Sequence, residues 1–144
     1  MNAIGASVHL AANQLIANSA FTAINFTGGT ALDFDTSAFF SAGSPTLFTM
    51  PFAGLYLFSA SIFWDPNATG QREITFAKNG AIRFGCSAQP GNNSGDSAQD
   101  LSVLMSLAAG DTVALNVLQN SGGNLNANGS TTQLFTFQSV LGFH

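Results

Sequence analysis

The sequence has very little charge for its length. Charged residues make up 7% of the 144 residues, and three Lys and Arg against seven Asp and Glu give a net charge of −4. An ordinary soluble domain carries roughly 25% charged residues. The shortage excludes a coiled coil, which needs many charged residues. It also argues against nucleic-acid binding, because three cations cannot neutralise a row of phosphates.

Long apolar runs are also missing, although hydrophobic residues make up 46% of the chain. That fraction excludes intrinsic disorder, which combines low hydrophobicity with high charge. No run approaches the roughly 18 apolar residues of a membrane helix, so no membrane partner is expected. The first residues lack the Lys or Arg and the apolar segment of a secretory signal peptide. We therefore expect a protein that is made in a host cytoplasm and stays there or leaves as part of a particle.

Residues that could support catalysis or metal binding are few. The only histidines are His9 and His144, and we expect the latter to be a solvated chain end. A lone cysteine such as Cys86 is usually a small buried residue, and it cannot form an internal disulfide. Asp33 and Asp35 could bind calcium, but no calcium-binding loop follows them, so we expect both on the solvated side of a strand. We predict no enzymatic activity, no metal site and no cofactor.

The chain is rich in apolar residues that alternate with polar ones. This period of two is typical of strands, whereas helices repeat every 3.6 residues. The clearest strand runs from Gly54 to Trp64, where aromatic residues alternate with small or hydroxyl residues. The opposite face also contains apolar residues, Leu57 and Phe63. The first face is predicted to consist of Tyr56, Phe58, Ala60, Ile62 and Trp64.

Two hairpins are predicted in the middle of the chain. The first joins residues 71–78 to the apolar run that starts at Ala81, because the intervening Asn79 and Gly80 both tolerate the positive φ of a type I′ turn.

The second hairpin joins residues 101–107 to residues 113–117. Its turn contains Gly110 and Asp111, and we expect the Asp111 carboxylate to accept backbone N–H groups.

The remaining segments complete an all-β pattern. Residues 89–97 and 120–132 consist almost entirely of turn-forming residues and are predicted to be exposed loops. Residues 135–143 alternate up to the end of the chain, and residues 32–35 read as a half-buried strand. Residues 10–20 fit a strand or extended segment better than a short helix. Eight to ten short strands with glycine-rich turns indicate a sandwich, jelly roll or barrel.

Four segments resemble, in order, the motifs of one family. They are the aromatic strand Phe52–Ala60, the turn Lys78–Gly80, the strand pair Leu107–Leu115 and the closing strand Phe135–Phe143. Together they are similar to the globular head of complement component one subcomponent q, in the tumour necrosis factor-like superfamily, over roughly residues 35–144. The resemblance implies an antiparallel two-sheet jelly roll of about ten strands that forms a compact homotrimer.

The residue pattern also supports assembly, because several strands are apolar on both faces and surplus apolar faces mark interfaces. The chain departs from the family in two ways. It has no collagen repeat before the head, and the charged loops that bind calcium or antibody in animal relatives have no counterpart. We expect a structural or trimer core of Tyr56, Phe58, Ile62, Trp64, Leu115, Val117, Phe135, Phe137 and Phe143. The predicted turn residues are Gly54, Asn79, Gly80, Gly110 and Asp111.

Two functions remain open. The first is a virion structural protein, as a capsid decoration or cement protein or a head-fibre knob, with a major capsid protein or another virion protein as its partner. Residues 1–30 would then be an N-terminal arm that grips the shell, or the first strands, ahead of a jelly-roll domain at 31–144. The alternative is a knob that binds a host receptor or glycan, with Trp64 or Tyr56 as candidate aromatic contacts. The candidate recognition residues are Asn92, Asn93, Asp96, Asn124, Asn126 and Asn128.

Overall fold

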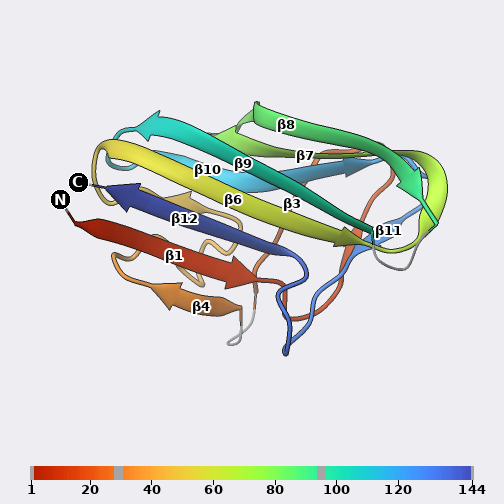
Figure 1. Cartoon of the computed structure of the whole chain (residues 1–144), viewed down its shortest axis with the longest axis horizontal. Helices are drawn as coiled ribbons and strands as arrows, with labels where there is room; N and C mark the ends of the chain where they lie inside the picture. Colours follow the sequence, from red (N-terminus) through yellow and green to blue (C-terminus); the bar gives the residue numbers. More distant parts are fainter. Residues whose placement is uncertain (1, 28–30, 94–96, 144) are drawn as a thin grey trace.

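The computed structural model describes residues 2–27, 31–93 and 97–143. Within them every regular element is a strand, which confirms the all-β prediction, and the strands form a two-sheet jelly roll (Figure 1). Helices long and apolar enough to cross a membrane are absent from these residues. The strands are β1 (Ala3–His9), β2 (Gln14–Ile16), β3 (Thr22–Ala23), β4 (Leu32–Asp35), β5 (Phe48–Thr49), β6 (Gly54–Trp64), β7 (Asn67–Lys78), β8 (Ala81–Asn92), β9 (Ser97–Leu107), β10 (Thr112–Gln119), β11 (Leu125–Ala127) and β12 (Phe137–Phe143).

The two sheets differ in size and are antiparallel throughout. The larger sheet has the order β2-β11-β6-β12-β1-β4, and β9 pairs with the other edge of β6. The smaller sheet has the order β3-β10-β7-β8, and β5 also pairs with β10. Strand β6 is therefore central, because it pairs with β9 along its whole length and with β12 on its opposite edge.

The core lies between the two sheets and is built largely from aromatic side chains. Strand β6 turns Tyr56, Phe58, Ile62 and Trp64 inward, and all four are fully buried. The ring of Phe58 packs 5.6 Å, centroid to centroid, from that of Phe76 in the facing sheet. Leu115 and Val117 of β10 are fully buried as well. These predicted residues therefore belong to the core of a single chain.

The first predicted hairpin is confirmed. Strands β7 and β8 pair from Lys78 opposite Ala81, and the turn residues Asn79 and Gly80 have φ values of 49° and 82°. Both values lie in the left-handed region that a type I′ turn requires.

The second predicted hairpin is wrong. Strand β9 pairs with β6 in the larger sheet, whereas β10 pairs with β7 in the smaller one. The turn itself forms as expected, because the Asp111 carboxylate accepts the backbone N–H of Ala108 at 2.9 Å and Gly110 has a φ of 87°. The two strands show the same alternation because they face one core from opposite sheets. A turn signal alone does not say which sheet the next strand joins.

The two long loops are also shorter than predicted. Strand β8 continues through residues 89–92 and β9 starts at Ser97, so only a few residues separate them. In the second loop, Leu125 and Ala127 of β11 are buried and pair with β2. Asparagine and glycine in these segments obscured strands that tertiary pairing imposes.

The N-terminal residues form strands of the sandwich. Strand β1 lies between β12 and β4, and it buries Ile4, Ala6 and Val8 in the core. Residues 10–20 are extended and contain β2, as the sequence favoured, and a free arm is not found between residues 2 and 27. Removing residues 1–30 would therefore delete a core strand.

Strand β4 differs from its prediction as a half-buried strand. It pairs only with β1 and is the outer strand of the larger sheet, so Leu32 and Phe34 are both about half exposed. Asp35 is not simply solvated either. Its carboxylate accepts backbone N–H groups of the following turn, including those of Phe39 and Phe40 at 3.1 and 2.9 Å.

The two ends of the sandwich have different roles in the chain. Both termini lie side by side at one end, where Ala3 pairs with Phe143 (Figure 1). The last residues of β6, β8 and β10 and the first residues of β7, β9 and β11 lie at the opposite end, which we call the distal tip.

Candidate interaction surfaces

The outer side of the larger sheet carries a cluster of exposed large apolar side chains near the termini. Register places them side by side, because Leu57 pairs with both Leu104 and Leu141, and Leu55 pairs with Phe143. Their exposed fractions range from 40% to 64%. We call the set Leu55, Leu57, Leu104, Leu141 and Phe143 the apolar face.

A shallow hollow of about 430 Å³ adjoins the apolar face. Gly5 of β1 lies opposite Leu141 and offers no side chain to fill the space beside Leu57 and Phe34. A Cβ at Gly5 would come within 2.7 Å of the backbone oxygen of Val140, so the strand pairing itself keeps this position empty. The face is therefore apolar and indented, which suits a protruding side chain from another molecule.

Along the same outer side, the surface changes from apolar to polar toward the distal tip. The next row across the sheet pairs Ser102, Ser59, Ser139 and Ser7, and the hydroxyls of Ser59 and Ser102 are 3.0 Å apart. The sheet thus offers a strongly apolar area at the terminal end and a hydroxyl-lined area beyond it.

A second apolar area lies at the edge of the smaller sheet. Ile82 and Phe84 of β8 are each 40% exposed, and we call them the apolar edge. Phe84 and Val103 of β9 both line a groove of about 200 Å³. Arg83 and Gly85 have positive φ values, and the register with β7 shifts nearby. Such bulges interrupt the free hydrogen-bonding row of an edge strand, so this edge offers side chains more than backbone pairing.

The predicted trimer-core residues of the last strand lie on the outer side. Phe143 belongs to the apolar face, and Phe137 is half-buried beside His9 and Ser61. Phe135 precedes β12 and stacks on Phe63 with ring centroids 4.8 Å apart. The inward positions of β12 are smaller: a Cβ at Gly142 would overlap the ring of the buried Tyr56.

The distal tip brings most of the predicted recognition residues to one end. Asn92 lies opposite Asn67 at the end of the β7–β8 pair, and Asn93 follows in the next connection. The Asn126 side-chain amide donates to the Asp65 carboxylate at 2.8 Å, which ties β11 to the β6–β7 connection. Asn124 is exposed beside them.

Two of the predicted recognition residues are exceptions. Asp96 lies outside the described residues. Asn128 is largely held by the fold, since its backbone N–H donates to the Phe63 oxygen at 2.7 Å. The Asn128 side-chain oxygen is buried and accepts no hydrogen bond from the described residues.

A buried arginine, Arg72, stabilises the backbone next to the distal tip. Arg72 is 1% exposed, and its guanidinium donates to the backbone oxygens of Asn67, Thr69 and Gln71 at 2.9–3.0 Å. Burial lowers the pKa of Arg72. The guanidinium also lies 5.9 Å from the centre of the Trp64 ring, within cation–π range. It thus satisfies three carbonyls in the first turn-like residues of β7, close to the distal tip.

Trp64 and Tyr56 are not available as recognition contacts, which corrects the prediction. The Trp64 indole N–H donates to Gln99 at 3.2 Å inside the core, and the Tyr56 hydroxyl donates to the backbone oxygen of Phe52 at 2.6 Å. Burial raises the pKa of Tyr56. Aromatic residues at the inward positions of a strand fill the sandwich, so the ring faces are not exposed.

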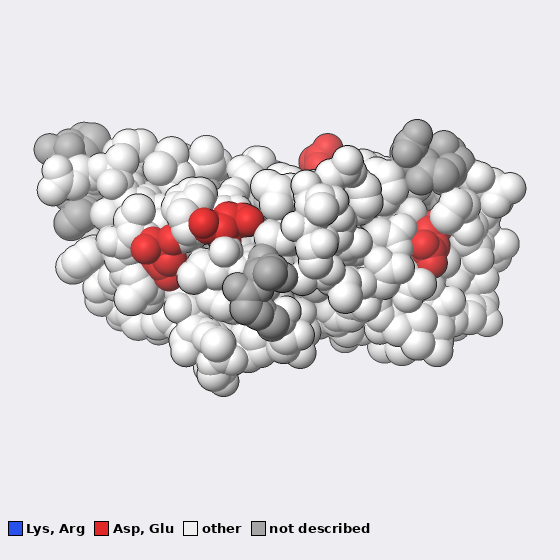
Figure 2. All heavy atoms as spheres, turned by 90° about the horizontal axis from the view of Figure 1, so that it is seen from below, with Lys and Arg blue, Asp and Glu red and all other residues white. Residues whose placement is uncertain are grey.

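All three cationic side chains of the chain interact with groups of the same chain. Arg72 is buried, the Lys78 ammonium lies 3.4 Å from the Asp111 carboxylate, and the Arg83 guanidinium lies 3.6 Å from that of Glu73. Figure 2 shows separate acidic spots on an otherwise uncharged face, with no basic side chain in view. Such a surface suits neutral partners better than anionic ones.

One polar cluster was not predicted. His9 is buried, and its Nδ1 lies 2.7 Å from the Asp33 carboxylate, whose second oxygen accepts a hydrogen bond from Ser7 at 3.1 Å. Both side chains contact the carboxylate, and the histidine is not placed as a base for the serine. The cluster therefore fastens β4 to β1. Groups of three or more His, Cys, Asp or Glu that could hold a metal are absent from the described residues.

Cys86 is exposed, contrary to the expectation of a buried thiol. It lies on β8, an edge strand with few inward positions. Its thiol donates to Glu73 at 3.3 Å. Desolvation raises the pKa of Cys86, and the hydrogen bond and negative charge of Glu73 raise it further, so the thiolate is disfavoured.

These features define an all-β jelly-roll domain with an unpartnered apolar face and without an assembled catalytic site among its described residues. The sequence model of the C1q domain family matches residues 21–137, which is most of the chain. The chain therefore belongs to the C1q domain family. Domains of this family and of the related tumour necrosis factor family are generally non-catalytic binding domains.

Solved structures show the same fold. Murine APRIL at pH 8.0 is 12% identical, with a TM-score of 0.67, over 99% of this chain and 100% of that chain. Murine APRIL at pH 5.0 gives 12% identity and a TM-score of 0.66 over the same shares. The Eiger TNF from S. frugiperda is 14% identical, with a TM-score of 0.61, over 100% of this chain and 94% of that chain. No curated protein matches the sequence significantly.

Proposed function

We propose that three copies of the chain assemble through the apolar face into a non-enzymatic head that binds other molecules. The observation that carries this proposal is the exposure of Leu55, Leu57, Leu104, Leu141 and Phe143 on one side of one sheet. Isolated apolar residues are common on surfaces, but a contiguous cluster marks an interface. Homotrimers are the usual assembly of domains in these families.

Threefold symmetry needs two different patches on each copy, because a closed ring joins one surface to another. The chain offers two: the apolar face, with its hollow at Gly5, and the apolar edge of Ile82 and Phe84. They lie on neighbouring strands at one side of the sandwich, since β8 contacts β9 and β9 pairs with β6. This arrangement supports a ring in which each copy contributes one patch to each neighbour.

The oligomeric state can be tested with Leu57→Asp and Leu141→Asp. We expect the unaltered protein to sediment at three times the 14.9 kDa of the chain and both variants to sediment as folded monomers. The matched control is Leu134→Asp, because Leu134 is 52% exposed but lies outside the apolar face. A single 14.9 kDa species for the unaltered protein at micromolar concentration would refute the proposal.

Within this assembly, we propose a virion structural role, as a head-fibre knob or a capsid decoration or cement protein. The shortage of surface charge supports this role, because charge keeps free monomers soluble and apart, and a protein held in a larger assembly needs less of it. The separation of the termini from the distal tip favours a knob that is attached at one end. Gripping by a free arm is not supported, because residues 3–9 form strand β1, which pairs with both β12 and β4.

The virion role predicts that purified trimer co-sediments with capsids that lack it. The control is the Leu57→Asp monomer, which should bind more weakly because it has lost multivalency. Absence of co-sedimentation with both capsids and fibre proteins would reject this role while leaving the trimer intact.

A receptor- or glycan-binding knob is the second candidate. It is favoured by the convergence of Asn92, Asn93, Asn124 and Asn126 at the tip, far from the termini. Binding to host cells that is lost in Asn93→Lys and Asn124→Lys, with sedimentation unchanged, would support this candidate over the structural role.

A further inference from the structure

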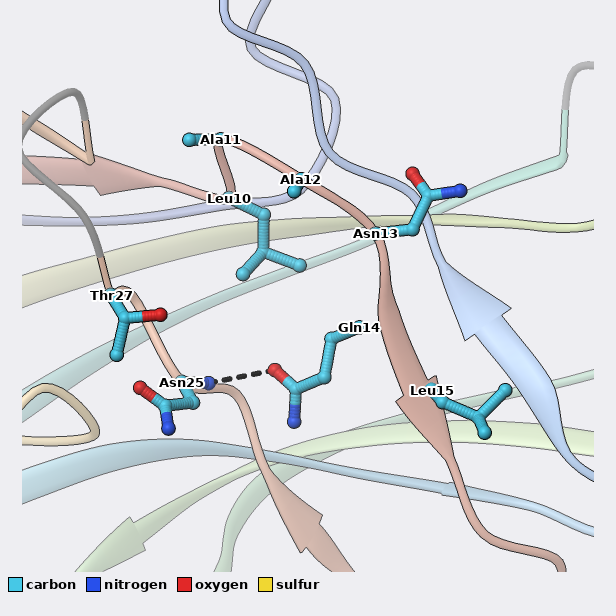
Figure 3. A pocket seen from close by; sticks show the side chains of 8 residues that line it. All are labelled: Leu10, Ala11, Ala12, Asn13, Gln14, Leu15, Asn25 and Thr27. Atoms are coloured by element: carbon cyan, nitrogen blue, oxygen red, sulfur yellow. Dashed lines mark hydrogen bonds between the residues drawn. The ribbon is translucent and has the colours of Figure 1, made fainter.

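We propose that a hollow beside β2 binds a neutral carbohydrate. It has a volume of about 560 Å³, within the range of small-molecule sites, and lies between residues 10–15 and the segment that follows β3 (Figure 3). The site lies within one chain, apart from the residues of the apolar face, so it does not depend on the trimer. Its lining residues are Leu10, Ala11, Ala12, Asn13, Gln14, Leu15, Asn25 and Thr27.

The frame of the hollow is fixed by side chain to backbone hydrogen bonds. The Gln14 amide spans the two segments, since its nitrogen donates to the Ala23 oxygen at 3.0 Å and its oxygen accepts the Asn25 backbone N–H at 2.8 Å. The Asn13 side-chain oxygen accepts the backbone N–H of Gly129 at 3.0 Å. Leu10 is buried beneath. A ligand would therefore meet walls that are already ordered, which lowers the entropic cost of binding.

The groups left over in the hollow are those that recognise sugar hydroxyls. The Asn25 side-chain amide and the Thr27 hydroxyl form no hydrogen bond with the described residues, and both residues are exposed. The Asn13 side chain points away from this space, and its oxygen accepts from Gly129 (Figure 3). Figure 3 shows Thr27 and Asn25 on one side of the space and Leu10 and Gln14 on the other. Amides and hydroxyls both donate and accept, as a sugar hydroxyl requires.

Charge selects the class of ligand. Lys, Arg, His, Asp and Glu are absent from the described residues that line the hollow, and the three cations of the chain are engaged elsewhere. A phosphate, nucleotide or carboxylate would find no counter-charge, and a metal ion would find no carboxylate. Leu10, whose side chain points toward Gln14 and Asn25, suits the C–H side of a sugar ring (Figure 3). With no aromatic platform, a single site should bind weakly, and a trimer would present three sites to a glycan surface.

The test is a titration followed by amide proton–nitrogen correlation spectra, in which side-chain amides of Asn and Gln are visible. The probes are N-acetylglucosamine, galactose and glucose, with inorganic phosphate as the charged comparison. We expect saturable shifts of the Asn25 and Gln14 side-chain signals with at least one neutral sugar and no such shifts with phosphate.

The variants are Asn25→Ala and Thr27→Val, which leave the Gln14 bridge to the backbone in place. Each should weaken sugar binding about fivefold, the effect of one neutral hydrogen bond, while Asn2→Ala at the exposed terminal end should not. The proposal is overturned if no neutral sugar gives saturable shifts, if phosphate shifts the same signals, or if the two variants bind as tightly as Asn2→Ala. The Leu57→Asp monomer should bind the probes unchanged, so failure of the trimer and failure of this site give different results.

Discussion

The two sides of strand β6 are both apolar, yet they have different roles. The inward side consists mainly of aromatic residues, among them Phe58, and it is fully buried within one chain. The outward side carries Leu55 and Leu57, which remain about half exposed. One side holds the chain in its fold, and the other is available to hold copies of the chain together. A strand that is apolar on both sides therefore indicates an interface between chains as well as a core within one chain.

The strongest test of this comparison is to damage the inward side. Phe58→Ala removes a ring that packs between the sheets, and we expect it to lower the free energy of unfolding by about 3–5 kcal/mol, the usual cost of an aromatic cavity. The loss should appear in chemical denaturation at every protein concentration. A loss that disappeared at high concentration would mean that the inward side is also an interface.

A polar contact on the inward side should have the next largest effect. Gln99 accepts the Trp64 indole N–H and donates to the backbone oxygen of Ser87 at 2.6 Å. Gln99→Leu would leave buried polar groups unpaired, so we expect a loss of roughly 2–3 kcal/mol in denaturant unfolding. An unchanged unfolding free energy would show that water takes over the hydrogen bonds of the Gln99 amide and that the fold does not require this side chain.

Damage to the outward side should leave the single chain nearly intact. Leu55→Ser is expected to change the unfolding free energy of the monomer by less than about 0.5 kcal/mol, as for other exposed sites. The unaltered protein should melt at a higher temperature as its concentration rises, because assembly stabilises the folded state. Leu55→Ser should weaken that dependence, and Leu134→Ser should keep it.

The smallest effect concerns an exposed turn away from both sides. Hydrogen bonds from Asn79 and then from the Ala108 backbone hold the pKa of Asp111 below its ordinary value of 3.8. The ionised form is therefore favoured by folding, and its contribution is complete above pH 3.8 and is lost as the pH falls through the lower folded value. Asp111→Asn should lower the melting temperature slightly at pH 7 and progressively less below pH 3.8. A difference that grew in acid would contradict this assignment.

Local signals in the sequence predicted local structure well. The Asn79–Gly80 turn and the alternation of β6 fix their own geometry within a few residues. The partner of β9 could not be read in the same way, because alternation is identical whether the next strand joins the same sheet or the facing one. Strand β11 was hidden for a related reason, since its pairing with β2 overrides a segment rich in asparagine and glycine.

The candidate surfaces were only partly accessible from the sequence. Leu57 and Phe63 on the second face of β6 predicted an interface, but the contribution of Leu104 depends on a pairing between strands far apart in the chain. The apolar edge is local to β8, but its exposure depends on β8 being the outer strand of the smaller sheet. The hollow beside β2 arises where residues 10–15 meet the segment after β3, and no sequence motif marks it.

The pairing of Ala3 with Phe143 has a practical consequence. Paired residues on neighbouring antiparallel strands lie roughly 4.5–5.5 Å apart, so a short linker joins the two ends without disturbing the sheet. A circular permutant with new ends at the Asn79–Gly80 turn would keep every strand pair. It would lose only the peptide bond that joins β7 to β8 through this turn. Cargo fused beside Ala3 or Phe143 would leave the distal tip clear, whereas cargo fused at the new ends would emerge beside the apolar edge.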